Sequence, residues 1–311
     1  MKILLTGSNG FVGRSLLPLL EEGSEILTVS VRDDADCSEH ILSEYDVASF
    51  ARLVKLYKPD RIIHLAGVMK SESPDIYYRV NFHYAQTILS VARADPKRPQ
   101  VILIGSAAEY GINHADSLLL CEEQDGIPIN YYGASKLAQT KLGLWYRKDG
   151  LPVTILRVFN LTGPGQGINF VLGKVVNYIV HYTSQLINQS SSNLPLEIGF
   201  LGDQRDFLDV RDFCRLLRNI SCTDYKEDYP LLNVCTGTGT KVRDLVEELL
   251  FLRDIPYSVI QEEVSPNETP TAIIGDPKKF IEFYGSSLVF NSGRTLRAML
   301  EAGLDSNTET A

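Results

Sequence analysis

Apolar runs of strand length alternate with amphipathic segments through the first half of the chain. The apolar runs predict buried strands at 1–6, 25–31, 61–67, 101–104 and 153–157. The segments between them predict helices at 11–20, 47–57, 74–94 and 132–148. Continuous apolar strands separated by helices are typical of a parallel sheet that is covered on both faces. We therefore expect an α/β fold with a doubly wound, Rossmann-like parallel sheet, whose ligands lie beyond the carboxyl ends of the strands.

The pattern becomes shorter and less regular after Asn160, as is typical of a smaller lobe. Further elements are predicted at 168–181, 196–200, 206–209, 211–220, 231–234, 241–253 and 257–261. We expect a dinucleotide-binding domain over 1–160, to which 203–235 returns, and a mainly substrate-binding C-terminal α/β lobe over 161–311. The polar stretch 185–193 predicts a loop, and the residues from Asp305 onward predict a disordered tail.

Composition narrows the function classes. With 311 residues, of which 44% are hydrophobic, the chain can bury a large core. The net charge of −9 argues against binding to nucleic acid or to an anionic membrane. No apolar run approaches the ~20 residues of a membrane span. The five scattered cysteines predict reduced thiols, and the chain begins with a core strand rather than a signal peptide. We expect a cytoplasmic protein without a metal site.

Three glycines follow the first strand and precede the first helix. Gly7 can adopt a turn conformation that is closed to residues with a Cβ atom. Gly10 lets the backbone approach a pyrophosphate at a helix N-terminus, where free N–H groups and the helix dipole favour anions. Gly13 lets the helix lie close to its strand. The alternative is a glycine-rich turn without a ligand.

Tyr132 and Lys136 lie four residues apart at the start of a predicted helix, so their side chains share one face. A nearby ammonium favours the phenolate, so we expect the tyrosine pKa to fall from its usual ~10 towards a value useful for proton transfer. The alternative is an ordinary Tyr–Lys pair on a helix surface. Tyr131 is out of register with the lysine and is assigned to packing.

Ser106 follows the buried strand at 101–104 among small residues that leave room for a ligand. Its hydroxyl can hydrogen-bond a substrate hydroxyl or carbonyl, or it can cap a helix or turn. Glu109 is a candidate second acid or base, although we expect it to be solvated or to lie behind the residues that contact substrate. The ends of the strands bring the glycine turn, Ser106 and the Tyr132–Lys136 pair to one crevice.

These motifs together resemble the extended short-chain dehydrogenase/reductases, the NAD-dependent epimerase/dehydratase group. The resemblance runs from residue 1 to about 290, and the segments that carry it are Thr6–Gly13, His64–Gly67, Ser106 with Tyr110-Gly111, Tyr132-x-x-x-Lys136, Arg157–Gln166 and Arg205–Asp212. Within the group, the segments Gly105–Gly111 and Phe159–Gln166 and the run from Thr269 to Lys279 most resemble GDP-4-dehydro-6-deoxy-mannose reductases.

The resemblance implies a role for each matching residue. Ser106, Tyr132 and Lys136 would be catalytic: the first two hydrogen-bond a sugar carbonyl, Tyr132 transfers the proton, and Lys136 holds the nicotinamide ribose. Asn160 and Arg205 would contact the diphosphate of a nucleotide sugar, and Ser106 would contact its sugar. The alternative for Arg205 is an ion pair with Asp206 or Asp209. Asp46 would contact adenine. The implied cofactor-binding residues are Gly7, Asn9, Gly10, Phe11, Val12, Gly13, Arg32, Asp46, Val47, Leu65, Ala66, Gly67, Tyr132 and Lys136.

Three positions depart from common patterns of the group. NAD-selective enzymes carry an acid at the end of the second strand, whereas here that position is Ser30, with Arg32 two residues on. A hydroxyl and a cation suit a 2′-phosphate, so NADP is the expected cofactor and NAD the alternative. Ala107 and Ala108 stand where sugar 4,6-dehydratases carry an acid. Ser265 stands where many relatives carry an arginine that meets the substrate phosphate.

The expected reaction is NADPH-dependent reduction of a nucleotide-linked 4-keto-6-deoxy sugar. The first alternative is a nucleotide-sugar 4-epimerase with tightly held NAD, which shares the catalytic trio, and a 4,6-dehydratase ranks below it. A non-catalytic, dinucleotide-sensing protein is the remote alternative. The resemblance also implies a homodimer, with the helices at 74–94 and 132–148 forming a four-helix interface.

Overall fold

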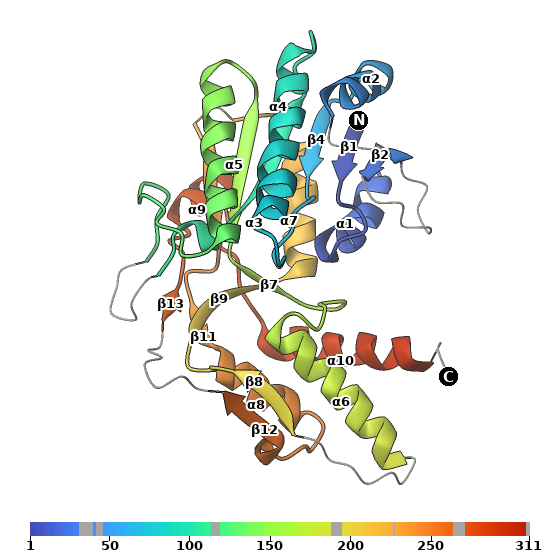
Figure 1. The fold of residues 1–311 in the computed structure, drawn as a ribbon, viewed down its shortest axis with the longest axis vertical. Helices are drawn as coiled ribbons and strands as arrows, with labels where there is room; N and C mark the ends of the chain where they lie inside the picture. The colour runs from blue at the N-terminus through green and yellow to red at the C-terminus, as the bar shows by residue number, and fades with distance from the viewer. Residues whose placement is uncertain are drawn as a thin grey trace.

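A seven-stranded, fully parallel sheet forms the centre of the computed structural model (Figure 1). The model describes residues 1–30, 40–41, 46–112, 119–187, 195–226, 228–263 and 271–308. The strands of this sheet are β1 (Lys2–Thr6), β2 (Glu25–Ser30), β3 (His40–Ile41), β4 (Arg61–His64), β5 (Gln100–Ser106), β6 (Val153–Val158) and β10 (Leu231–Val234).

The strand order β10-β6-β5-β4-β1-β2-β3 reverses direction between β1 and β4. Every neighbouring pair is parallel, and Thr6 at the end of β1 lies beside His64 at the end of β4. In a doubly wound sheet, ligands bind outside the carboxyl ends of the strands at such a reversal point. The predicted fold class is therefore confirmed, and the glycine turn lies at the reversal.

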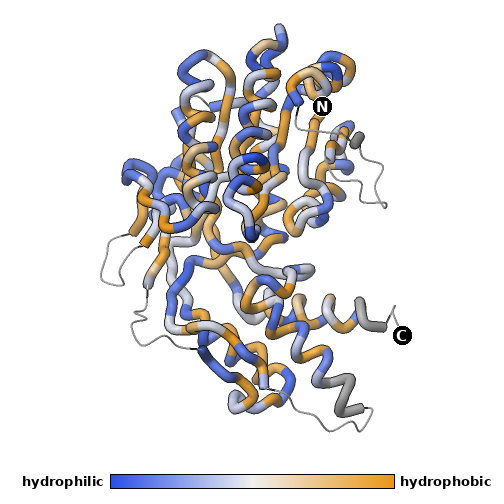
Figure 2. The backbone as a smooth tube through the Cα atoms, viewed as in Figure 1, coloured by the Kyte–Doolittle hydropathy of each residue, from blue (hydrophilic) through white to orange (hydrophobic). Residues whose placement is uncertain are grey.

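Helices cover both faces of the sheet because its strands are apolar on both sides, which Figure 2 shows as orange along their length. Ile3 and Leu5 pack in one core with α1 and α7, whereas Leu4 faces a second core with α2 and α4. The helices around the sheet are α1 (Phe11–Glu21), α2 (Val47–Tyr57), α3 (Pro74–Tyr77), α4 (Tyr84–Ala94), α5 (Tyr131–Lys148), α7 (Val210–Cys222) and α9 (Lys278–Tyr284).

The predicted helix at 74–94 is interrupted. Between α3 and α4 the segment Tyr78–His83 winds as a π-helix, which widens the turn around the buried Asn81. Such π-helical turns are rare and occur often at functional sites. The 3.6-residue pattern of the sequence could not show this wider turn, because the apolar residues on either side of it still face the sheet.

A third hydrophobic core lies in the lower part of Figure 1. Two small sheets contribute to this part: β7 (Asn160–Thr162), β9 (Gln204–Asp209), β11 (Gly239–Lys241) and β13 (Ala272–Ile273) in one, and β8 (Leu196–Gly199) with β12 (Ile260–Glu263) in the other. Its helices are α6 (Val171–Ile187), α8 (Val242–Phe251) and α10 (Ser292–Thr308). Among the described residues, the two short 3₁₀ turns are η2 (Ala107–Glu109) and η3 (Tyr257–Val259). The prediction of a disordered tail from Asp305 is wrong as far as Thr308, because α10 continues to that residue.

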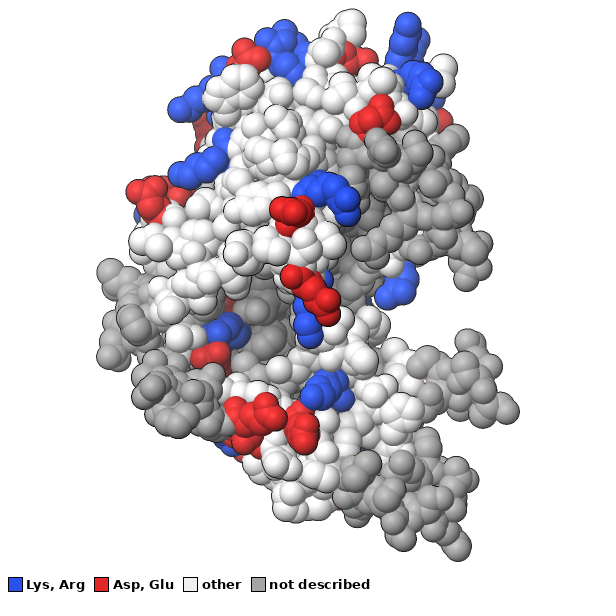
Figure 3. All heavy atoms as spheres, viewed as in Figure 1, with Lys and Arg blue, Asp and Glu red and all other residues white. Residues whose placement is uncertain are grey.

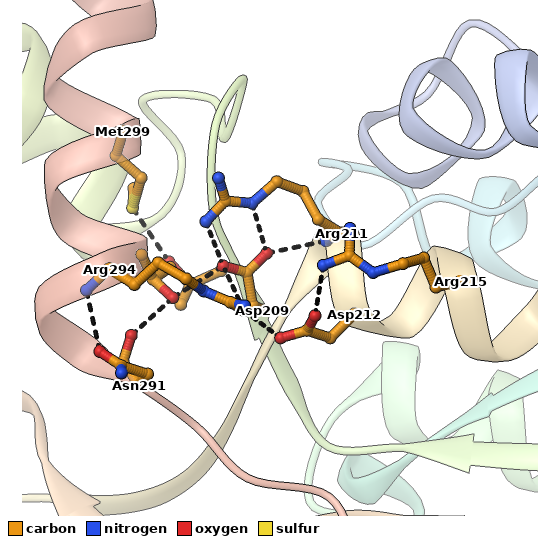
Figure 4. Close-up of polar contacts among 9 residues, drawn as sticks. Asp209, Arg211, Asp212, Arg215, Asn291, Arg294 and Met299 are labelled. Carbon is orange, nitrogen blue, oxygen red and sulfur yellow. Dashed lines mark hydrogen bonds and ion pairs between the residues drawn. The ribbon is translucent and has the colours of Figure 1, made fainter.

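A carboxylate joins α7 to α10 (Figure 4). Asp209, which is fully buried, accepts hydrogen bonds from the backbone and guanidinium of Arg211 and from the Thr295 hydroxyl of α10. Arg294 of the same helix pairs with Asp212. Because Asp209 also N-caps α7, one side chain fixes the start of a helix on the central sheet and the helix that closes the lower core.

Charged side chains on the face in Figure 3 lie interspersed, with no large patch of one sign. This distribution agrees with the negative net charge and gives that face no basic track for a nucleic-acid backbone. Among the described helices, none combines the length and the apolar character that crossing a bilayer requires.

Candidate active site

The glycine turn joins β1 to α1 and leaves the start of the helix open. Gly7 has a positive φ of 77°, and the Gly10 amide donates to the Gly7 carbonyl at 3.1 Å, which closes the turn. A Cβ atom on Gly13 would lie 2.2 Å from the Gly7 oxygen, so the helix needs a glycine there. The N-cap residue of α1 is Gly10, which has no side chain to cap the helix.

Gly10 differs from its two neighbours in the motif. A Cβ atom on Gly10 would meet only the Gly7 oxygen, at 3.3 Å, and otherwise open space. The turn thus presents backbone N–H groups and the positive end of a helix dipole around a free volume, which suits a pyrophosphate. The residues present fit the dinucleotide that the motif predicts.

The loop after β4 packs directly on the glycine turn. The Leu65 amide donates to the Thr6 carbonyl at 3.1 Å, and the Ala66 amide to the Thr6 hydroxyl at 3.4 Å. A Cβ atom on Gly7 would lie 2.6 Å from the Ala66 nitrogen. The structure therefore brings the predicted cofactor residues of the two strand ends together at the reversal point of the sheet.

The predicted glycine roles give a matched pair of variants. We expect Gly10→Ala to keep the fold and to weaken NADPH binding at least about tenfold, equivalent to ~1.4 kcal/mol, because the added methyl group enters the free volume. Gly13→Ala should instead lower the free energy of unfolding by about 2 kcal/mol, because its methyl group meets backbone. Fluorescence titration with NADPH and thermal melts measure the two effects. Unchanged NADPH binding by Gly10→Ala would contradict this placement of the pyrophosphate.

The structure brings Ser106 and Tyr132 together at the end of β5. Ser106 ends that strand, and its side chain lies close enough to that of Tyr132, which is half-buried in the first turn of α5, to act on the pKa of the phenol. Ser106 is also the N-cap of η2, so its hydroxyl accepts from the Ala108 amide at 3.2 Å. The structure thus shows the capping role that the sequence left open for this serine, and its hydrogen bond to a substrate stays a prediction.

Lys136 lies one helical turn after Tyr132 and is buried. Its Nζ donates to Oε1 of Gln139 at 2.7 Å, and Gln139 in turn donates to the Ile104 carbonyl. Burial disfavours the ammonium and lowers the pKa of Lys136 to about 8, against the opposing effect of Glu109. The lysine therefore still carries its proton at neutral pH.

The expectation of a lowered tyrosine pKa is wrong for the protein itself. Burial of the phenol raises the pKa of Tyr132, the hydrogen bond from Ser106 lowers it, and the charge of Glu109 raises it further. The net direction is upward. Desolvation outweighs the opposing effect of Ser106, so Tyr132 is a protonated phenol over the physiological range and is suited to donate a proton.

Glu109 is not solvated. Its side chain is fully buried beneath Ser106, with Oε1 accepting from the Ser106 amide at 2.8 Å. Oε2 accepts from Nε and Nη2 of Arg157, at 3.1 and 2.9 Å. Because both oxygens are engaged behind the strand end, Glu109 cannot serve as an acid or base towards a substrate. The sequence did not indicate its partner, which lies 48 residues further along the chain.

Asn81 is a site residue that sequence reasoning missed. Its amide binds the backbone of Val68 in both directions, at 2.8 and 3.0 Å, and donates to the Ser135 hydroxyl at 2.9 Å. Ser135 in turn donates to the Tyr132 carbonyl. Asn81 thus ties the loop after β4 to the first turn of α5. Asn81 lies on the buried face of the segment 74–94, and a buried amide needs hydrogen-bond partners. This position was the feature of the sequence that could have indicated its role.

The two predicted diphosphate contacts lie on neighbouring strands. Asn160 begins β7, two residues after Val158, which is the partner of Ser106 in the sheet, and it faces Phe207 of β9. Arg205 lies on β9, two residues before Phe207. The ion pair of Arg205 is with neither Asp206 nor Asp209.

Arg205 pairs instead with Asp203, at 2.6 Å. Its Nη1 donates to the hydroxyl and carbonyl of Thr271. Burial lowers the pKa of Arg205, although Asp203 opposes this effect. Asp203 lies just before β9, whereas Asp206 is buried and accepts from the amides of Thr236 and Gly237. Any substrate phosphate would have to share the guanidinium with this carboxylate.

The adenine end of the predicted cofactor site is described only in part. Asp46 caps α2, with Oδ1 accepting from the Ser49 amide at 2.8 Å, and these Ser49 contacts lower its pKa. Val47 is more than half exposed. Arg32 and Ser265 lie outside the described residues. The contact of Asp46 with adenine therefore stays a prediction, as does that of Arg32 with a 2′-phosphate.

A pocket of about 500 Å³ opens beside Tyr132. Tyr131, assigned to packing from the sequence, is in fact more than half exposed, and its ring stacks on Tyr77 with centroids 6.5 Å apart. The pocket is lined by Met69, Ser71, Glu72, Pro74, Tyr77, Asn130, Tyr131 and Tyr132. Three of its eight lining residues are tyrosines, and the pocket reaches Tyr132.

Comparison with known proteins agrees with this geometry. The model of the NAD dependent epimerase/dehydratase family matches residues 3–230. The chain is 29% identical over 308 residues to the GDP-6-deoxy-D-talose 4-dehydrogenase of Aggregatibacter actinomycetemcomitans, a match that covers 97% of this chain and 96% of that protein. It is 29% identical over 273 residues to the GDP-6-deoxy-D-mannose reductase of Pseudomonas aeruginosa, covering 84% and 83% of the two chains.

A solved structure resembles the whole fold. The structure of RMD from Pseudomonas aeruginosa complexed with NADPH superposes with a TM-score of 0.79 at 25% identity. The superposition covers 98% of this chain and all of that one.

Proposed function

Because the chain belongs to the NAD dependent epimerase/dehydratase family, we propose that it is an NAD(P)-dependent oxidoreductase that reduces a nucleotide-linked 4-keto-6-deoxy sugar of the GDP-4-dehydro-6-deoxy-mannose type. The observation that carries this proposal is the contact of Ser106 with Tyr132, one turn before Lys136 and beside the open glycine turn. We further propose that residues 1–160, with 203–235, bind the dinucleotide and that the remainder mainly binds the substrate.

Each catalytic side chain has a task in the reduction. The nicotinamide of the bound dinucleotide supplies the hydride to the carbonyl carbon. Ser106 and Tyr132 hydrogen-bond the carbonyl oxygen, and Tyr132 Oη gives that oxygen its proton. The Lys136 ammonium stabilises the phenolate that remains, and a proton from solvent restores the phenol.

The same site lacks the groups for a 4,6-dehydration. The two positions after Ser106 are Ala107, which is buried, and Ala108. Glu109, the nearest carboxylate along the chain, is engaged by the Ser106 amide and by Arg157. Proton abstraction and loss of water would need an acid or base facing the sugar. This arrangement favours a reductase or a dehydrogenase over a dehydratase.

The names of the relatives support a GDP-linked deoxy sugar as the substrate, since two of them act on GDP-6-deoxy sugars by name. We propose that Asn160 and Arg205 contact the diphosphate. Of the Arg205 guanidinium nitrogens, Nη1 and Nη2 are engaged within the protein, so the substrate would bind with Asp203 beside it.

We propose NADPH as the preferred cofactor. Ser30 ends β2, where NAD-selective enzymes carry an acid. The related structure from Pseudomonas aeruginosa contains NADPH, which supports this preference. NAD is the alternative.

The proposal predicts a specific assay result. The purified protein, given a panel of nucleotide sugars and their 4-keto derivatives, should consume NADPH only with a 4-keto-6-deoxy sugar, and at least about tenfold more efficiently with the GDP-linked form. NADH should be the poorer cofactor. The absorbance of reduced nicotinamide measures both preferences. A protein that consumes no NADPH with any keto sugar would contradict the proposal.

A 4-epimerase would give a different result in the same assay. It would interconvert two nucleotide sugars without added cofactor, and the isolated protein would retain NAD. The family supports this alternative, because the catalytic trio serves both reactions.

We also propose a homodimer and a reducing compartment. The helices α4 and α5 lie side by side, and Trp145 on the latter is 59% exposed, which supports the four-helix interface implied by the resemblance. The four described cysteines are free, which supports a cytoplasmic location.

A further inference from the structure

A buried ion pair lies directly behind the catalytic side chains. The side chains of Glu109 and Arg157 are 0% and 3% exposed, and the guanidinium lies over the ring of Tyr110, 4.4 Å from its centroid. The Tyr110 hydroxyl donates to Asn233 and to the Cys121 carbonyl, which holds the ring in place. The catalytic roles proposed above use neither member of the pair.

Such a pair is costly to bury. Two charges lose their hydration, and apolar side chains of similar volume are often at least as stabilising. Packing alone therefore gives a weak reason for Glu109 and Arg157. Their effect is better sought in the electric field that they impose on their neighbours.

The field of Glu109 acts on both catalytic groups of α5. Its charge raises the pKa of Tyr132 and also that of Lys136, in each case by favouring the protonated form. In β4, burial and, to a lesser extent, the charge of Lys136 lower the pKa of His64. Burial holds the pKa of His64 at about 3, so the imidazole is neutral at physiological pH.

The backbone adds a second link between Glu109 and the site. Oε1 of Glu109 accepts from the amide of Ser106, the residue whose hydroxyl contacts Tyr132. A Cβ atom at position 105 would lie 2.6 Å from the same oxygen, so Gly105 lets the carboxylate approach this close. Arg157 binds the other oxygen and turns the carboxylate away from the substrate side.

We propose that Glu109, clamped by Arg157, is a positioning residue that keeps the protons on Tyr132 Oη and Lys136 Nζ while it fixes the Ser106 amide. It never contacts the substrate. It acts as a fixed negative charge beneath Tyr132, so that Tyr132 and Lys136 are both protonated when the sugar carbonyl binds. The kinetic part of this inference rests on the proposed function, whereas the ionisation of Lys136 does not.

The test replaces the charge and keeps the shape. Glu109→Gln retains an oxygen that can accept from the Ser106 amide. Loss of the negative charge removes stabilisation of the ammonium, so the Lys136 midpoint should fall by about 0.5–1 pH unit. The probe is ¹³C NMR of protein labelled at lysine Cε, without cofactor or substrate, with the Lys136 signal assigned from Lys136→Met. The alkaline limb of kcat for reduction should move in the same direction.

Two further variants make the outcome decisive. Should Glu109→Gln alone fail to fold, the double variant Glu109→Gln/Arg157→Met removes the guanidinium that this substitution leaves unpaired. We expect the Lys136 midpoint to be lowered in the double variant as well. Glu122→Gln is the matched control, because Glu122 binds the Asn233 amide and does not act on Lys136. It should titrate as the parent does.

The result that would overturn the proposal is a Lys136 midpoint unchanged in both Glu109 variants. A uniform loss of kcat with an unshifted titration would give Glu109 a purely structural role and would equally overturn it. If no keto sugar is turned over but the Lys136 midpoint still falls, the proposed reaction fails and the electrostatic role of Glu109 stands.

Discussion

Replacing Tyr132 with phenylalanine should reduce kcat for sugar reduction about 10³-fold, within the 10²–10⁴-fold range of positioned general acids. The substitution removes the hydroxyl that we propose as the proton donor and on whose pKa Ser106 acts. NADPH binding should change little, because the glycine turn and the loop after β4 do not depend on this hydroxyl. Stopped-flow or steady-state absorbance gives the rate, and fluorescence titration gives the binding.

The neighbouring residue supplies the control for this experiment. Tyr131→Phe makes the same chemical change one position earlier, on a side chain that is more than half exposed and out of register with Lys136. It should turn over at nearly the rate of the parent protein. Near-parental turnover by Tyr132→Phe would remove Tyr132 from the mechanism.

Lys136→Met should lose turnover and gain stability. The pKa of Lys136 in the fold, about 8, lies below its ordinary 10.5, so the unfolded chain binds the proton more tightly. The buried ammonium therefore lowers the free energy of unfolding by at most about 3 kcal/mol. This destabilisation is fully present below pH 8 and is lost as the pH rises towards 10.5. Methionine removes this cost but also the hydrogen bond to Gln139, worth about 1 kcal/mol.

The net expectation is that Lys136→Met raises the free energy of unfolding by about 2 kcal/mol at pH 7 and by much less at pH 10. Urea unfolding at the two pH values measures it. Lys141→Met, on the same helix but exposed, should show neither the gain nor its pH dependence. A Lys136→Met variant that is destabilised at pH 7, or whose gain in stability is independent of pH, would contradict a destabilising, buried Lys136 ammonium.

Local spacing explains what could be predicted about this site. The glycine turn and the Tyr132–Lys136 register depend on residues within seven positions of one another, so the periodicities of turn and helix reveal them. The doubly wound parallel sheet was predicted from apolar runs alternating with helices.

Partners far apart in the sequence explain what could not be predicted. The burial of Glu109 depends on Arg157, 48 residues on, and the contacts of Asn81 depend on Ser135, 54 residues on. The direction of the Tyr132 pKa depends on how much water the finished fold excludes, which spacing does not reveal. The helical end of α10 was missed because its polar composition resembles that of a loose tail.

The order of the strands also limits how this chain can be divided. The edge strand β10 and the covering helix α7 join the central sheet only after the chain has left it and built part of the lower core. A gene fragment that stops at residue 160 would expose the apolar side of α1 that α7 covers and would leave β6 as a bare edge. The central sheet with its covering helices is therefore built from two separate stretches of the chain, and neither stretch is an independent unit for expression or for grafting onto another protein.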